Sequence, residues 1–174
     1  KAPLVYSKVV IRNWQPFIKL GVHEVYSPAA PYSRVKLDYP VSMGGYQHPR
    51  DPDRPIGLHM VYVPTLPGSG LSTREQSRKG RALLLGTPFE VHEQMIREQL
   101  QGMLGEAGFD HQRDIQAITV NRWSHGYSYF LNGLFDDEDE AKKIIETARQ
   151  PIGKIAIANS DADWSPYANS AIDQ

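Results

Sequence analysis

Residues 4–12 read LVYSKVVIR, a stretch rich in β-branched residues in which apolar and polar side chains partly alternate. This pattern predicts a β-strand. The segments IGLHMVYVP (56–64) and DIQAITVNRW (114–123) have the same character and predict two further strands. Shorter strands are expected in VHEVYS (22–27) and SRVKLDYP (33–40). These segments together indicate that a β-sheet is a main part of the fold.

The middle of the chain carries the signals of two helices. Ser72 and Glu75 form a capping-box pattern at the start of the first. Thr87, Pro88 and Glu90 provide a cap, a first-turn proline and a glutamate for the second. Apolar residues then recur at three- and four-residue spacing, which predicts one buried helix face ending near Gly108. These residues are Phe89, Ile96, Leu100, Met103 and Ala107.

Two more helices complete the expected fold. One covers residues 13–21, and the other covers residues 136–151, DDEDEAKKIIETARQP, whose acids lie in the first turn, as suits the helix dipole. The acidic run is interpreted as a solvated helix start rather than as a metal or polyamine site. Strands and helices are mixed without strict alternation, which predicts an α/β or α+β fold, a mixed sheet flanked by helices.

Composition excludes several classes of function. The 174 residues carry a formal net charge of −1, so the concentrated basic surface of a nucleic-acid-binding protein is not expected. No apolar run is long enough to predict a membrane span. Without cysteine there is no disulfide, thiolate metal site or cysteine nucleophile. The six histidines lack the spacing of a zinc site, and His92 and His111 are expected to be exposed.

Two stretches near the end of the chain are candidates for ligand binding. In ITVNRWSHGYSYF (118–130) a strand leads into a cluster of aromatic residues that could form the wall of a flat ligand's site. In GKIAIANSDADWSPYANSAIDQ (153–174) a short apolar strand is expected to lead through a turn of small residues into a helix. Small residues let the backbone approach a ligand, and free N–H groups at a helix start favour a negative or electron-rich group.

These two stretches, in this order, resemble the C-terminal part of flavin-dependent amine oxidases, with bacterial spermidine dehydrogenases as the most similar group. Val120 and Trp123 match the family's strand that ends in Trp, and residues 127–129 stand in its Gly-Ser-Tyr place. Residues 153–155 match the start of its last strand, and residues 166–171 match its last helix. Several family glycines and a glutamate are replaced here, so the chain resembles a divergent branch.

The resemblance implies an FAD-dependent enzyme that oxidises an amine, here a polyamine such as spermidine, to an imine by hydride transfer to the flavin. Tyr129 and Tyr167 match the two rings that flank the amine, and Trp123 and Trp164 are candidates for the pocket wall. The residues implied to face the FAD phosphates or ribityl chain are Asn159, Ser160, Asp161 and Ala162. Those implied to direct N–H groups at the flavin ring are Ala168, Asn169 and Ser170.

The resemblance also implies how the chain is organised. Residues 1–150 would belong to the substrate-binding domain, and residues 151–174 would be a returning segment of the FAD-binding domain, so the chain is expected to be a C-terminal fragment. Its partner would be the N-terminal FAD-binding part of the same enzyme, because no Gly-x-Gly-x-x-Gly motif occurs here. A flavin–haem enzyme would require a haem ligand, for which the candidates are His23, His59, Met60 and His125.

Two alternatives stay open at this point. A related FAD-dependent desaturase would share the terminal flavin motif, but its substrate channel would be apolar throughout. A non-catalytic binding module would fold and bind its ligand without a further domain. The compartment in which the protein works is not predicted by the sequence.

Overall fold

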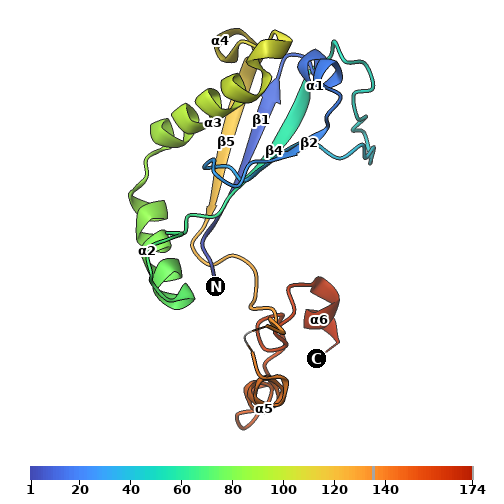
Figure 1. The fold of residues 1–174 in the computed structure, drawn as a ribbon. Helices are drawn as coiled ribbons and strands as arrows, with labels where there is room; N and C mark the ends of the chain where they lie inside the picture. The colour runs from blue at the N-terminus through green and yellow to red at the C-terminus, as the bar shows by residue number, and fades with distance from the viewer. Residues whose placement is uncertain (135, 174) are drawn as a thin grey trace. The chain divides into compact units, whose positions relative to one another are not determined.

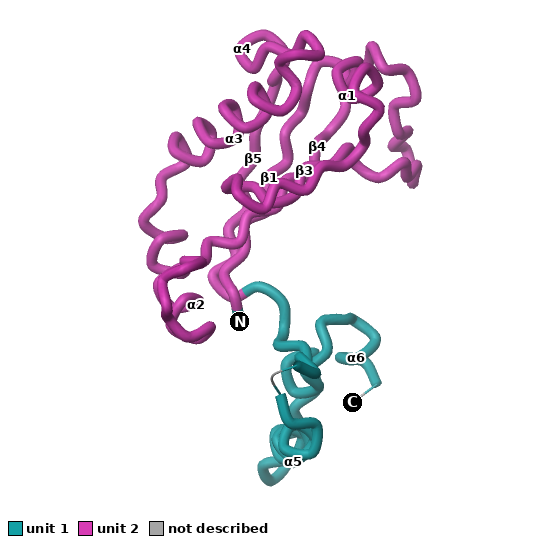
Figure 2. Tube along the Cα trace, viewed as in Figure 1, with its two compact units in different colours: residues 1, 126–174 teal, residues 2–125 magenta. Residues whose placement is uncertain are grey.

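The structure is a computed structural model that describes residues 1–134 and 136–173. The chain forms two compact units, one of residues 2–125 and one of residue 1 with residues 126–174 (Figure 2). This division reflects packing alone. The assignment of residues 1–150 and 151–174 to substrate and FAD domains stays a prediction, and its last residue, Gln174, lies outside the described residues.

The larger unit contains a five-stranded sheet with the order β2-β3-β4-β1-β5 (Figure 1). Its strands are β1 (Leu4–Ile11), β2 (Glu24–Tyr26), β3 (Arg34–Leu37), β4 (Ile56–Tyr62) and β5 (Ile115–Trp123). The strands predicted in this part of the chain are therefore confirmed, with their ends shifted by a few residues. The mixed α/β character of the fold is confirmed as well.

The expectation of mixed strand directions is wrong for this sheet. Each of its pairings is antiparallel, including those of β1 with β4 and with β5. The helices between β4 and β5 form a crossover that returns the chain in the same direction. However, β1 lies between these two strands, so the two parallel strands are not neighbours. The first strand of the chain thus separates what would have been a parallel pair.

The helices of the larger unit follow the predicted order. They are α1 (Gln15–Leu20), α2 (Thr73–Gly86), α3 (Phe89–Leu104), the 3₁₀ turn η1 (Gly105–Ala107) and α4 (His111–Asp114). The capping box at the start of α2 is confirmed, because the Ser72 Oγ accepts from the Glu75 N–H and the Glu75 carboxylate accepts from the Ser72 N–H. The cap predicted for α3 is wrong: the Thr87 hydroxyl donates to the Leu83 carbonyl oxygen at 2.7 Å instead.

The core of the larger unit lies between α3 and one face of the sheet, along which α3 runs in Figure 1. In β1 every second side chain is fully buried, and Val5, Val9 and Ile11 belong to the core. From α3 the apolar residues Ile96 and Leu100 are fully buried, as the periodicity predicts. Leu104 joins them, whereas Phe89 is 42% exposed, so the predicted apolar face was wrong at its first position.

A polar trio is buried within this core. The Tyr32 hydroxyl lies 2.9 Å from Ser7 Oγ and 3.4 Å from His92 Nδ1. His92 is only 1% exposed, so the expectation of an exposed histidine on α3 is wrong. Burial among apolar side chains lowers the pKa of His92 below its ordinary value, and raises that of Tyr32 to about 12. Both groups are thus held in their neutral forms.

The buried His92 makes the stability of the larger unit depend on pH. Because its pKa in the folded chain lies below the ordinary value of 6.5, the unfolded chain binds the proton first as pH falls. The stabilisation is present above pH 6.5 and is lost progressively below it. We expect the free energy of unfolding to fall between pH 7 and pH 5, and to fall less in His92→Gln. Urea titrations at several pH values measure the free energy of unfolding, and His125→Gln, at an exposed histidine, is the control. Equal pH slopes for wild type and His92→Gln would contradict it.

The smaller unit contains α5 (Glu138–Ala148) and α6 (Ala168–Ile172). Asp137 caps α5 by accepting from the Glu140 N–H at 2.9 Å, which agrees with the reading of the acidic run as a helix start. The strand expected at residues 154–158 is not formed, and only an isolated bridge joins Ile152 and Ile155. Ile155 is 66% exposed. An apolar strand is stable only where neighbouring strands accept its hydrogen bonds, and the described residues of this unit offer none.

None of the helices formed by residues 1–134 and 136–173 combines the length and the apolar character that crossing a membrane requires.

Candidate functional site

The predicted site residues Tyr129 and Trp164 come together in the smaller unit. Their ring centroids are 5.0 Å apart with an interplanar angle of 74°, which is the edge-to-face arrangement that aromatic quadrupoles favour. The Tyr129 hydroxyl donates to Asp136 Oδ2 at 2.7 Å. We refer to Tyr129, Trp164 and Asp136 as the aromatic–acid cluster.

Local contacts hold this cluster in place. The N–H of Asn132 also donates to Asp136 Oδ2, at 2.7 Å. The two donors lower the pKa of Asp136, the Tyr129 hydroxyl having the larger effect, so the carboxylate is charged at neutral pH. In turn the carboxylate raises the pKa of Tyr129, which keeps its proton. Trp164 has a φ of 49°, a left-handed conformation that costs energy for a bulky residue and that the surrounding turn must impose.

Asp136 is a member of the site that the sequence did not reveal. It lies in the acidic run 136–140, which the residue pattern indicates to be a helix start, and that reading is right for Asp137. Asp136 instead folds back onto the loop before the helix. Asp137 is the N-cap of α5, so Asp136 precedes the helix and does not cap it. Its position just before the cap was the feature of the sequence that could have identified it as a separate group.

Of the other two predicted aromatic residues, Tyr167 belongs to the smaller unit and Trp123 to the larger unit. Tyr167 is 62% exposed, and no ring contact between described residues joins it to Tyr129. Trp123 ends β5 in the larger unit and is 55% exposed. Within this unit Tyr129 packs against Trp164, and the placement of Tyr129 and Tyr167 around an amine stays a prediction.

The residues predicted to face FAD phosphates form a closed turn. The N–H of Ala162 donates to both the backbone oxygen and Oδ1 of Asn159, at 3.1 and 2.9 Å. The N–H groups of Trp164 and Ser165 donate to the carbonyl oxygens of Asp161 and Ser160. The carboxylate of Asp161 pairs with the ammonium of Lys1 at 2.5 Å. Three backbone donors of this stretch are therefore engaged within the turn itself.

The residues predicted at the flavin ring open α6, which spans only five residues. Ala168 and Asn169 are exposed, and Ser170 is 8% exposed with its hydroxyl donating to Ser165 Oγ at 2.6 Å. The short helix and the engaged Ser170 hydroxyl leave the exposed Asn169 as the side chain available to a flavin, and the assignment of these residues to the flavin ring stays a prediction.

A second polar surface occupies the sheet face opposite to α3. The Lys8 ammonium lies 2.9 Å from Asp38 Oδ1, and Arg34 pairs with Glu24. The rings of Tyr6 and His59 lie 4.8 Å apart on this face. The alternation in residues 4–12 could have identified it, because Tyr6 and Lys8 stand between the apolar residues that enter the core.

Two of the candidate haem ligands, Met60 and His59, lie on neighbouring positions of β4. Met60, one of the candidate haem ligands, is fully buried in the core against α3, away from the sheet face that carries His59. Among the described residues no group of three or more His, Asp or Glu side chains could hold a metal ion.

A comparison with known protein families finds no family model that matches the chain, and a comparison with curated proteins finds no match either.

Proposed function

We propose that this chain forms part of an FAD-dependent amine oxidoreductase whose substrates are polyamines such as spermidine. The observation that carries the proposal is the aromatic–acid cluster. A π-face attracts an ammonium group that lies over it, and a carboxylate at its edge adds a Coulombic attraction. Within the cluster, ring edges and faces of Tyr129 and Trp164 stand beside the charged Asp136. The motif resemblance of residues 118–130 and 153–171 to amine oxidases supports the same assignment.

In this proposal the flavin is held mainly by the N-terminal part of the same enzyme. The turn at 159–165 supports this division, because three of its N–H groups donate to carbonyl oxygens within the turn and are not available to a cofactor. The smaller unit also exposes large apolar side chains that a further domain would cover. Those more than 60% exposed are Phe130, Leu134, Ile152, Ile155, Tyr167 and Ile172. The flavin, when bound, would supply the redox chemistry, and this chain would bind and orient the amine.

The charged acid also separates this proposal from the desaturase alternative. A desaturase channel for a hydrocarbon substrate would be apolar, and a carboxylate beside its aromatic wall would lose its hydration without compensation. Asp136 is charged and partly exposed, with a ring hydroxyl as its donor. This arrangement suits a substrate that itself carries positive charge.

The test compares amines on the intact enzyme of which this chain would be a part. Mixing with spermidine in the absence of oxygen should bleach its flavin absorbance, and kcat/KM for spermidine should exceed that for benzylamine by about tenfold or more. The preference should weaken with added salt, because salt screens the exposed Asp136. An intact protein without flavin would overturn the proposal. A flavoprotein that prefers benzylamine would be consistent with amine oxidation but would overturn the assignment of polyamines as substrates.

A further inference from the structure

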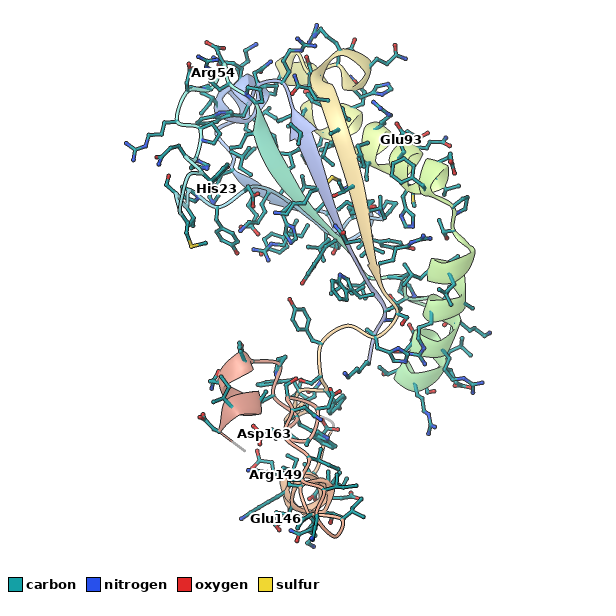
Figure 3. The ribbon with its side chains drawn as sticks, turned by 180° about the vertical axis from the view of Figure 1, so that it is seen from behind. His23, Arg54, Glu93, Glu146, Arg149 and Asp163 are labelled. Atoms are coloured by element: carbon teal, nitrogen blue, oxygen red, sulfur yellow. The ribbon has the colours of Figure 1, made fainter. Side chains whose placement is uncertain are left out.

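The larger unit contains a pocket of about 470 Å³ at the end of the sheet where β2 begins and β3 ends. This volume lies in the range of sites for small organic molecules. Figure 3 labels His23, the residue before β2, which is one of its lining residues. The complete lining consists of Trp14, His23, Glu24, Lys36, Leu37, Asp38, Tyr39, Pro40, His48 and Ile56.

The charge available in this pocket is positive. Glu24 and Asp38 are acidic, but Glu24 is paired with Arg34 and Asp38 is paired with Lys8 at 2.9 Å. The hydrogen bond from Arg34 lowers the pKa of Glu24, because the guanidinium stabilises the ionised carboxylate. A cationic ligand would have to compete with these cations, neither of which lines the pocket.

Lys36 is the unusual member of the lining. Its side chain is buried, with the residue only 6% exposed, and its ammonium lies 3.1 Å from the ring centroid of Tyr39. Among the described residues no ion pair involves this ammonium, and Glu24, opposite it in the β2–β3 register, pairs with Arg34. A buried cation whose partner is a ring has hydrogen-bond donors that remain to be satisfied.

His48 adds a further hydrogen-bonding group to the lining of the pocket. Nδ1 of His48 is buried and has no hydrogen-bond partner among the described residues. A buried polar atom of this kind indicates that something outside the described chain completes its hydrogen bonding. The other walls are apolar, contributed by Trp14, Leu37 and Ile56.

We propose that this pocket binds a small organic acid, with its carboxylate at Lys36 and His48 and its apolar body against Trp14, Leu37 and Ile56. An acid supplies the anion that the buried ammonium lacks and an acceptor for an imidazole N–H, while its body replaces water at the apolar walls. The site lies in the unit of residues 2–125, and it does not depend on the amine oxidoreductase proposal.

The test uses three probes with one body and different charges: 3-phenylpropionate, 3-phenylpropionamide and 3-phenylpropylamine. Calorimetric titration of the 174-residue chain should give a dissociation constant below about 1 mM for the acid, and binding at least about tenfold weaker for the amide and the amine. Amide signals from residues 36–39 and 48 should shift with the acid in nuclear magnetic resonance spectra. An amine that binds as well as the acid, or no binding of the acid at 10 mM, a concentration of about ten times the expected constant, would overturn the proposal.

Substitutions test whether the Lys36 ammonium is the group that binds the carboxylate of the acid. Lys36→Met keeps the apolar stem and removes the ammonium, so it should lose the preference for the acid over the amide. Lys79→Met, on the exposed surface of α2, is the matched control and should keep it. His48→Gln tests the second contact without touching the sheet, in case Lys36→Met lowers the melting temperature. Unchanged acid binding in both a folded Lys36→Met and His48→Gln would refute the site.

Discussion

Replacing Gly80 by alanine is expected to destabilise the larger unit by about 3 kcal/mol or more. Gly80 lies in α2, and a Cβ atom at this position would stand 1.9 Å from the carbonyl oxygen of Pro64 and 3.0 Å from Cγ of Pro3. The first contact is with backbone, so no side-chain rotation relieves it, and α2 must move away from the chain that follows β4. This movement would also withdraw Leu84, which is 1% exposed, from the core.

The matched control for this substitution is Gly102→Ala in α3. A Cβ atom there meets no neighbouring atom within 4 Å outside its own helix backbone, so alanine brings only its higher helix propensity. We expect Gly102→Ala to stabilise the chain by about 0.5 to 1 kcal/mol. Urea-induced unfolding of both variants measures the two changes. Similar stabilities for Gly80→Ala and Gly102→Ala would show that α2 does not pack closely against Pro64.

The same helix illustrates what the sequence could predict. The start of α2 followed from Ser72 and Glu75, since a capping box uses only atoms that are local in the sequence. The close approach of Gly80 to Pro64 was not predictable, because it depends on where the helix lies relative to β4. Local hydrogen bonding fixes where an element begins, whereas packing fixes which of its residues must be small.

The errors in predicted burial have a related cause. His92 lies on the buried face of α3, at four-residue spacing before Ile96, yet its polarity suggested exposure. The hydroxyl of Tyr32, from a loop far away in the sequence, lies 3.4 Å from its Nδ1, a contact that the sequence pattern of α3 could not reveal. Phe89 was expected in the core and is exposed because it opens the helix, where the core has not yet begun.

In the smaller unit a segment that was predicted to be a buried strand is exposed instead. The run IAIA at 155–158 has the composition of a buried strand, but Ile155 is exposed and lacks neighbouring strands. Composition indicates that this segment would be stable as a strand if neighbouring elements buried it, but it does not show whether such elements are present. For the site, the aromatic residues were predictable from their types, while the pairing of Tyr129 with Trp164 and Asp136 required the turn that brings them together.

Replacing Tyr129 by leucine in the intact enzyme should lower kcat/KM for spermidine by about tenfold or more, equivalent to about 1.4 kcal/mol. Leucine removes the π-face, the edge contact with Trp164 and the hydroxyl that donates to Asp136. Tyr129→Phe keeps the ring and loses only the hydroxyl, and Asp136 is accessible to water that can replace this donor. We therefore expect phenylalanine to keep most of the activity.

A second aromatic residue separates the cluster from a general effect of removing a ring. Phe130, the next residue, is 63% exposed and lies outside the cluster, so Phe130→Leu should leave kcat/KM within about twofold of wild type. Flavin content and melting temperature of each variant establish that the enzymes are folded and loaded. If Tyr129→Leu retains wild-type kcat/KM, the aromatic–acid cluster does not bind the amine. If Phe130→Leu loses as much as Tyr129→Leu, the loss is not specific to the cluster, because of these two side chains Tyr129 is the one that donates to the Asp136 carboxylate that an ammonium group would approach.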